Sequence, residues 1–165
     1  MPRKKRGPRT NAMRLLDANG IAYQVFTFSA DIHSATGVAE AVGLEPSTVY
    51  KTLVVQRQMG KPLLVMLAGD KRVDLQALAA SVGEKRLRMA THRDAEALTG
   101  LQVGGISALV LLNKGFDICI DRAAQHLDHV TISAGQRGIN LRLAVPDLIR
   151  VTQARWVDTT GVEDR

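Results

Sequence analysis

The chain has 165 residues, of which 45% are hydrophobic and 23% charged, a balance typical of one globular domain that folds without disulfides or metal. No run approaches the ~20 apolar residues that span a bilayer, and no apolar segment follows the N-terminal charges, so we expect neither a membrane span nor a secretory signal. With a single cysteine, Cys119, no intramolecular disulfide can form, which favours a cytoplasmic protein.

The net charge of +6 is concentrated at the N-terminus. Five of the 22 basic residues lie in positions 1–9, where there is no acidic residue, which leaves 17 basic against 16 acidic residues in the remainder. We predict that residues 1–10 form a basic, disordered tail. Such a tail could attract phosphates non-specifically, or it could simply be a solvated end.

The first half of the chain alternates short helical and extended patterns. Residues 11–19 predict an amphipathic helix that ends at Asn19-Gly20, residues 21–28 a strand, and residues 37–42 a helix closed by Gly43. Two apolar runs, 49–55 and 62–68, flank a turn at Gly60 and predict a β-hairpin.

Lys51 is the unusual residue of this hairpin. Because strand side chains alternate between faces, Lys51 shares one face with Val49, Leu53 and Val55. The ammonium could point outward and protect an edge strand. If the face lines a cleft, the ammonium is instead partly desolvated and would attract an anion or a polarised carbonyl or phosphate oxygen.

The second half predicts further short elements. Asp74 and Thr91 are suited to cap helices that end at Gly83 and Gly100, and Asp121 to cap a helical turn. Extended patterns and one further helix, opened by Pro146, complete the chain. The predicted strands are 85–89 (or a connector), 109–112, 116–120, 130–133, 139–143 and 155–157, with 109–112 and 116–120 joined as a hairpin through 113–115. The class is a mixed α/β single domain with a curved, largely antiparallel sheet and short flanking helices.

Few residues suggest chemistry on their own. The four histidines lack a matching set of carboxylates or thiols, so we expect no metal and no cofactor. Cys119 has no partner histidine nearby, and Ser107 and Ser133 would be nucleophiles only beside a base that the sequence does not reveal. Two glycine-rich stretches, 100–107 and 133–138, are either tight turns or loops whose backbone N–H groups bind an oxygen.

Three segments in order resemble the YbaK-like family of prolyl-tRNA editing domains. These are Val49-Tyr50-Lys51-Thr52-Leu53-Val54-Val55, Val103-Gly104-Gly105-Ile106-Ser107 and Ile132-Ser133-Ala134-Gly135-Gln136-Arg137-Gly138. The resemblance covers residues 11–158 and leaves out the tail and a polar end at 159–165. It implies hydrolysis of mischarged tRNA, most specifically Cys-tRNA(Pro), by a cytoplasmic protein that binds the 3′ aminoacyl end of tRNA and could work with prolyl-tRNA synthetase.

The resemblance also implies a set of site residues. Lys51, Gly104 and Gly105 would be catalytic, as cationic and N–H donors to the developing oxyanion. The residues that would bind substrate are Phe28, Tyr50, Thr52, Ile106, Ser107, Ser133, Gly135, Arg137 and Gly138. A cysteine substrate could also use its own thiol to attack its own carbonyl.

This chain departs from the family pattern at three positions: Ala108 replaces a proline, Phe28 a tyrosine and Asn140 an aspartate. These changes leave two alternatives open. The enzyme could act on Ala-tRNA(Pro) or another small aminoacyl-tRNA, or the domain could bind tRNA without catalysis as a regulatory module.

Overall fold

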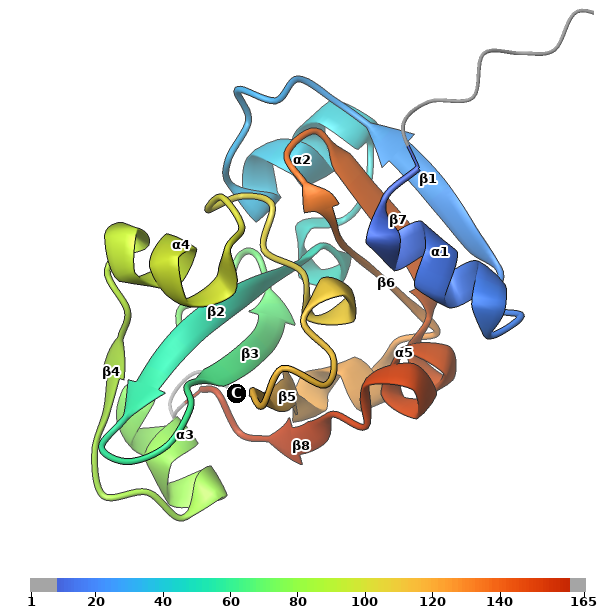
Figure 1. The fold of residues 1–165 in the computed structure, drawn as a ribbon. Coiled ribbons are helices and arrows are strands. Elements are labelled where there is room, and N and C mark those ends of the chain that lie inside the picture. Colours follow the sequence, from blue (N-terminus) through green and yellow to red (C-terminus); the bar gives the residue numbers. More distant parts are fainter. Residues whose placement is uncertain (1–8, 161–165) are drawn as a thin grey trace, which may run out of the picture.

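The computed structural model describes residues 9–160, which fold into short helices packed around two β-sheets (Figure 1). The α-helices in this range are α1 (Asn11–Ala18), α2 (Ala35–Val42), α3 (Leu75–Val82), α4 (His92–Thr99) and α5 (Val145–Thr152). The strands are β1 (Tyr23–Thr27), β2 (Tyr50–Arg57), β3 (Leu63–Ala68), β4 (Leu87–Met89), β5 (Asp117–Asp121), β6 (His129–Gln136), β7 (Ile139–Ala144) and β8 (Arg155–Val157).

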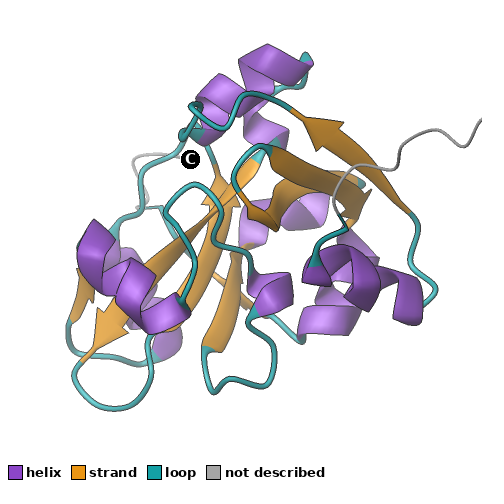
Figure 2. Ribbon diagram, turned by 45° about the horizontal axis from the view of Figure 1, so that its top comes forward, coloured by secondary structure: helices purple, strands orange, loops and turns teal. Residues whose placement is uncertain are grey.

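The larger sheet has the order β4-β2-β3-β5-β8 and the smaller one the order β1-β7-β6. Figure 2 shows the strands together with the helices and loops around them. β2 pairs antiparallel with β3 and β4, whereas β5 lies parallel to both β3 and β8. The smaller sheet is antiparallel throughout. The predicted mixed α/β class is therefore confirmed, but the strands form two sheets, which are bridged where Val49 pairs with Thr131.

Helix ends follow the predicted capping chemistry. Asp74 Oδ1 accepts hydrogen bonds from two backbone N–H groups of α3, and Thr91 Oγ1 accepts one from α4. Gly83 and Gly100 follow these helices with φ of +77° and +73°, a left-handed conformation that glycine adopts without a Cβ clash.

The predicted hairpin of residues 109–112 and 116–120 is wrong. Residues Ala108–Val110 form a 3-10 turn, and β5 joins the sheet as a parallel strand rather than as a hairpin partner. Ser107 caps this turn by accepting the Leu109 N–H, and Leu109 and Leu111 are buried in the main core. Apolar side chains that are buried by a single turn produce the same short hydrophobic run as a strand, so the pattern alone does not separate the two.

The second glycine stretch also differs from expectation. β6 continues through Gly135 to Gln136, with a register shift between Ser133 and Gln136, so most of the predicted turn is a bulged strand. The tight turn into β7 is confined to Arg137 and Gly138.

Residues 1–8, most of the predicted basic tail, and 161–165 lie outside the described part of the chain. Two residues next to these ends are packed. Thr10 caps α1 and is buried, and the Thr159 carbonyl accepts the Asp74 N–H at 2.7 Å. Within residues 9–160, no helix is long and apolar enough to cross a membrane.

Strand β3 is the centre of the larger sheet, and all six of its side chains are buried. We predict that Leu64→Ala lowers the free energy of unfolding by about 2–5 kcal/mol, because it removes buried methyl groups and leaves a cavity. Met59→Ala, at a side chain that is 85% exposed, should change it by less than about 0.5 kcal/mol. Urea unfolding of both variants is the measurement, and equal losses would contradict the assignment of β3 as the core strand.

Candidate active site

A cavity of about 440 Å³ lies where strand β2 is left without a neighbour. On this edge β2 pairs with β4 from Val55 to Arg57, the Val54 carbonyl accepts the Ala90 N–H at 3.0 Å, and Val49, the residue before β2, bridges to β6. All five residues between Val49 and Val55, Tyr50 to Val54, line the cavity. The strand therefore contributes residues from both of its faces. The alternation of side chains along a strand does not, for this reason, divide β2 into a cavity face and a core face.

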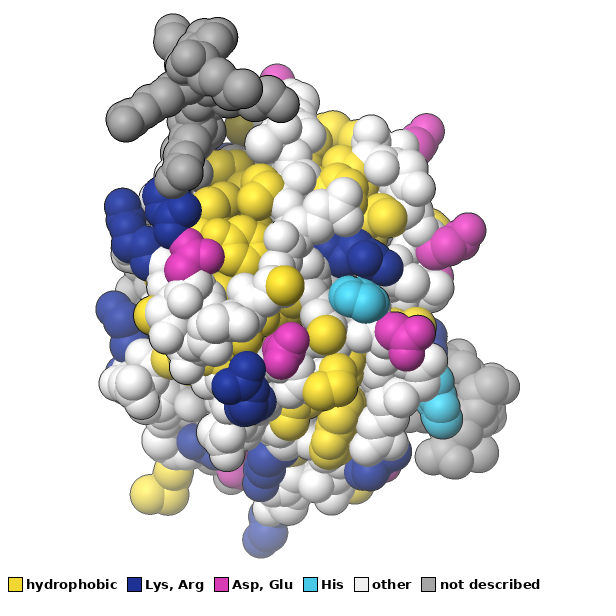
Figure 3. Space-filling model, turned by 90° about the vertical axis from the view of Figure 1, so that its right-hand side faces the viewer, with side chains coloured by type: hydrophobic (Ala, Val, Ile, Leu, Met, Phe, Trp, Pro, Cys, Tyr) yellow, Lys and Arg dark blue, Asp and Glu magenta, His cyan; other side chains and the backbone are white. Residues whose placement is uncertain are grey.

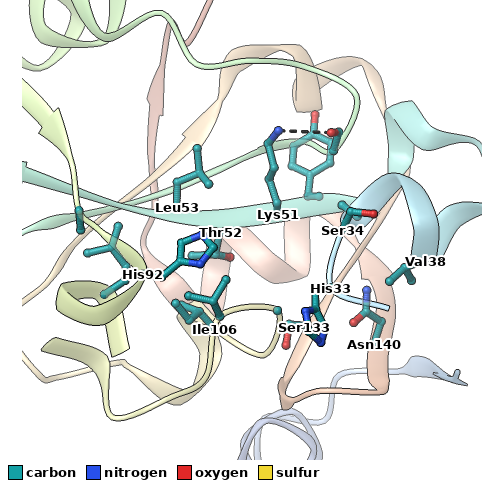
Figure 4. A pocket seen from close by; sticks show the side chains of 18 of the residues that line it. His33, Ser34, Val38, Lys51, Thr52, Leu53, His92, Ile106, Ser133 and Asn140 are labelled. Carbon is teal, nitrogen blue, oxygen red and sulfur yellow. Dashed lines mark hydrogen bonds between the residues drawn. The ribbon is translucent and has the colours of Figure 1, made fainter. Parts of the chain in front are cut away.

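Lys51 is a lining residue of this cavity, and its side chain leaves β2 on the same side as Leu53, whereas Thr52 lies on the side of Ile106 (Figure 4). The Lys51 ammonium donates hydrogen bonds to the carbonyls of Gly69, at 3.3 Å, and Lys71, both of which follow the end of β3. An ammonium has three N–H donors, so these two contacts fix its position and leave one donor for a ligand. The side chain is half-buried, which favours the cleft over the solvated edge.

The charged groups at the cavity are Lys51 in its lining and Asp70, Asp121 and Arg72 close by. Among the described residues that line it, none is Asp or Glu, and Lys51 supplies a cation. Burial lowers the pKa of Lys51, Asp70 opposes this effect and Arg72 adds to it. Burial, together with Asp121 and Asp70, raises the pKa of Tyr50, so its phenol stays protonated at neutral pH. The site is therefore suited to an anion or to an oxygen that gains negative charge.

The loop Val103–Ile106 forms the wall opposite β2, and it is held by side chains from two other elements. Glu96 Oε2 accepts the Val103 N–H at 2.9 Å, and Arg137 Nε donates to the Val103 carbonyl at 2.7 Å. Gly104 has a φ of +93°, and the Gly105 N–H donates to the Gln102 carbonyl at 2.8 Å within a turn. The Gly105 amide is thus already paired, whereas no described residue accepts the Gly104 N–H.

The structure brings together half of the residues singled out in the sequence. Tyr50, Lys51, Thr52, Gly104, Ile106 and Ser133 all line the cavity. The others support it from behind or lie apart from it, and are Phe28, Gly105, Ser107, Gly135, Arg137 and Gly138.

Two of the residues outside the cavity lining, Phe28 and Gly105, are held by packing contacts. Phe28 packs against the cluster of Val38, Ala39 and Val49. A Cβ on Gly105 would lie 2.9 Å from the backbone nitrogen of Arg137, so glycine is needed where the loop meets the β6–β7 turn.

Gly138 and Gly135 are likewise required for close packing. Gly138 accepts the Phe28 N–H, and a Cβ there would lie 3.0 Å from the Phe28 carbonyl oxygen. A Cβ on Gly135 would lie 2.5 Å from Val110 Cγ2, on the side of a second hollow lined by Arg9 and Arg14.

The sequence analysis did not assign several lining residues to the site, among them His33, Ser34, Gly69, His92 and Asn140, although it noted Asn140 as a departure from the family pattern. Asn140 is 5% exposed and is the register partner of Ser133 across β6 and β7. Gly69 directly follows β3, where a Cβ would lie 2.4 Å from Ala35 Cβ. Gly69 could have been found from the sequence, because it is a glycine at the end of a continuous apolar run. Nothing in the sequence spacing of His33 and His92 indicates that they lie in the same cavity.

Histidine and cysteine chemistry is limited in residues 9–160. In this range no group of three or more His, Cys, Asp or Glu side chains could hold a metal ion. Cys119 is buried in β5, and burial raises the pKa of its thiol to about 11, with Asp117 contributing. A thiol that remains protonated is a poor nucleophile, so Cys119 is a packing residue.

We predict that the lysine at position 51 loses its proton at a lower pH in the folded protein than in the urea-unfolded chain. Between the two pKa values the folded state binds fewer protons, so this group makes the protein more stable as pH rises through that window. NMR titration of the ¹³Cε signal, assigned with Lys51→Arg, measures both values. A folded midpoint at or above the unfolded one would refute the partly desolvated environment.

Comparison with known proteins agrees with this architecture. Residues 29–151 match the family model of the aminoacyl-tRNA editing domain. A candidate Cys-tRNA(Pro)/Cys-tRNA(Cys) deacylase, EbsC of Enterococcus faecalis, is 33% identical over 99% of this chain and 100% of that protein. The multifunctional Ser/Thr-tRNA deacylase ProXp-y of Escherichia coli is 26% identical over 87% of each chain.

A solved structure shows the same fold. The crystal structure of a candidate trans-editing enzyme for prolyl tRNA synthetase superimposes with a TM-score of 0.79 and 25% identity, covering 94% of this chain and 99% of that one. The expected family is confirmed: the chain belongs to the aminoacyl-tRNA editing domain family.

Proposed function

We propose that the protein is an aminoacyl-tRNA deacylase that hydrolyses mischarged tRNA in trans, with Cys-tRNA(Pro) as its main substrate. Family membership and the full-length similarity to the Enterococcus faecalis protein support the reaction and the amino acid. The observation that carries the proposal is the cavity itself, which Lys51 and Gly104 both line and which has no acidic residue among its described lining residues.

Such a site matches the chemistry of ester hydrolysis. Attack on the carbonyl of an aminoacyl ester places negative charge on the carbonyl oxygen, and donors fixed in advance stabilise that charge without reorganisation. The remaining N–H of Lys51 and the N–H of Gly104 are two of the donors among the residues that line this cavity, and we assign them to the oxyanion. An ester of a ribose hydroxyl is already activated, so orientation and these donors suffice without a Ser-His-Asp triad.

For cysteine, the substrate supplies its own nucleophile. The thiol sulfur forms a bond to the ester carbonyl carbon, the bond from that carbon to the ribose oxygen breaks, and the thiol proton passes to the ribose oxygen. Intact tRNA leaves, and water then opens the four-membered thiolactone to free cysteine. The protein needs only to hold the substrate in the reactive conformation and to stabilise the oxyanion.

The substrate's macromolecular part is tRNA, whose 3′ aminoacyl end would enter the cavity. The face drawn in Figure 3 carries Lys and Arg side chains interspersed with Asp and Glu rather than one uniform basic surface. A partner could present the tRNA, and the solved structure described as a trans-editing enzyme for prolyl tRNA synthetase suggests that enzyme. The protein would then work in the cytoplasm, where translation occurs.

Two alternatives rest on specific features. The Escherichia coli relative is named for serine and threonine, and a small pocket rejects larger residues better than smaller ones, so Ala-tRNA(Pro) or another small aminoacyl-tRNA is the second candidate. Asn140, in place of the family aspartate, lies in the cavity and leaves open a module that binds tRNA ends without turnover.

We predict that wild type deacylates Cys-tRNA(Pro) faster than Ala-tRNA(Pro) and that Lys51→Ala lowers the rate by about 100-fold or more, the typical loss of an oxyanion donor. Lys114→Ala removes the same charge from an exposed turn and should leave the rate unchanged. Single-turnover release of labelled amino acid is the measurement. Faster release of alanine than of cysteine would support the Ala-tRNA(Pro) deacylase instead. Binding of tRNA without release of either amino acid would support the non-catalytic module.

We further predict that cysteine is released from tRNA(Pro) about 1,000-fold faster than serine. Serine differs by one atom, and binding alone separates near-isosteres by roughly 10–200-fold. A larger ratio therefore requires that the thiol takes part in the reaction. Equal rates for the two esters would show that water is the direct nucleophile, while leaving the deacylase assignment intact.

A further inference from the structure

Arg137 lies outside the cavity lining, yet it contacts a peptide group that forms part of the wall. Its Nε donates to the Val103 carbonyl oxygen at 2.7 Å. That carbonyl belongs to the same peptide unit as the Gly104 N–H. The guanidinium is therefore connected to the proposed oxyanion donor through a single peptide bond.

The geometry of a trans peptide gives this contact a direction. In a trans peptide the C=O and N–H bonds point in opposite directions, and the described residues contain no cis peptide. Because the Val103 carbonyl points at Arg137, the Gly104 N–H points away from it. Val103 and Gly104 both line the cavity and Arg137 does not, so the N–H is directed to the cavity side.

The charge on Arg137 adds a second effect. A hydrogen bond from a cation to a peptide oxygen draws electron density from the nitrogen of that peptide, which makes its N–H a stronger donor. Within residues 9–160, no Asp or Glu oxygen lies within 4.0 Å of the Arg137 guanidinium, so its charge is not neutralised by an ion pair.

The neighbouring peptide is fixed independently. Glu96 accepts the Val103 N–H at 2.9 Å, on the peptide before the one that Arg137 contacts. The Gly105 N–H is held by Gln102, and the positive φ of Gly104 requires glycine. These contacts occupy the N–H groups on either side and leave the Gly104 N–H without an acceptor among the described residues.

We propose that Arg137 is a positioning residue for catalysis: through the Val103–Gly104 peptide it orients and polarises the Gly104 N–H that binds the oxyanion. This inference rests on the proposed deacylase function. It replaces the expectation that Arg137 touches the substrate with an indirect role. A group that acts only on the oxyanion should change kcat and leave KM nearly unaltered.

The test compares Arg137→Met, Arg137→Lys and Arg150→Met on the full chain. Arg150 is an exposed arginine of α5, so its variant controls for loss of charge. We expect Arg137→Met to lower kcat for Cys-tRNA(Pro) by about 10-fold or more with KM within about twofold, Arg137→Lys to recover part of the rate, and Arg150→Met to match wild type.

A second readout does not depend on activity. In ¹H–¹⁵N spectra of the free protein, the Gly104 amide proton should move upfield in Arg137→Met, because its peptide is less polarised, and stay in place in Arg150→Met. A raised KM with an unmoved Gly104 signal would overturn the proposal in favour of direct substrate contact, and an unchanged kcat would overturn it too. An inactive wild type would refute the deacylase function, while the shift would still test the role of Arg137.

Discussion

Incomplete pairing of strand β2 is the constraint on which the site depends. β4 and the adjoining Ala90 cover one end of its outer edge, and a single bridge at Val49, just before β2, covers the other, so residues 50–53 have no strand partner there and border a space between the two sheets. An open strand edge is usually a liability, because it invites another strand. Here the loop Val103–Ile106 and helix α4 lie across the gap, and the edge becomes one wall of a cavity.

Much of this arrangement was predictable because local chemistry determines it. Asp74 and Thr91 fix helix starts through side-chain oxygens, glycines with positive φ fix helix ends, and the β2–β3 hairpin follows from two apolar runs around a turn. Lys51 was identifiable because a lysine among aliphatic side chains in a strand needs a polar partner.

What could not be predicted depends on contacts between distant segments. A strand was predicted at residues 109–112 because a buried single turn and a buried strand give the same short hydrophobic pattern. Which residues of the second glycine-rich stretch line the cavity depends on how β6 pairs with β7. This pairing places Ser133 in the cavity lining and Arg137 outside it. His33, His92 and Asn140 share the site only because the loop before α2, the start of α4 and strand β7 converge there.

The state of Cys119 has a consequence for an enzyme that handles thiols. Each turnover on the proposed substrate releases cysteine, and free thiolates exchange readily with accessible, low-pKa protein thiols once these are oxidised. The only thiol of this chain is buried in β5 with a pKa raised to about 11. The protein therefore presents no reactive sulfur to its own product, and mixed disulfides with released cysteine should not accumulate while the fold is intact.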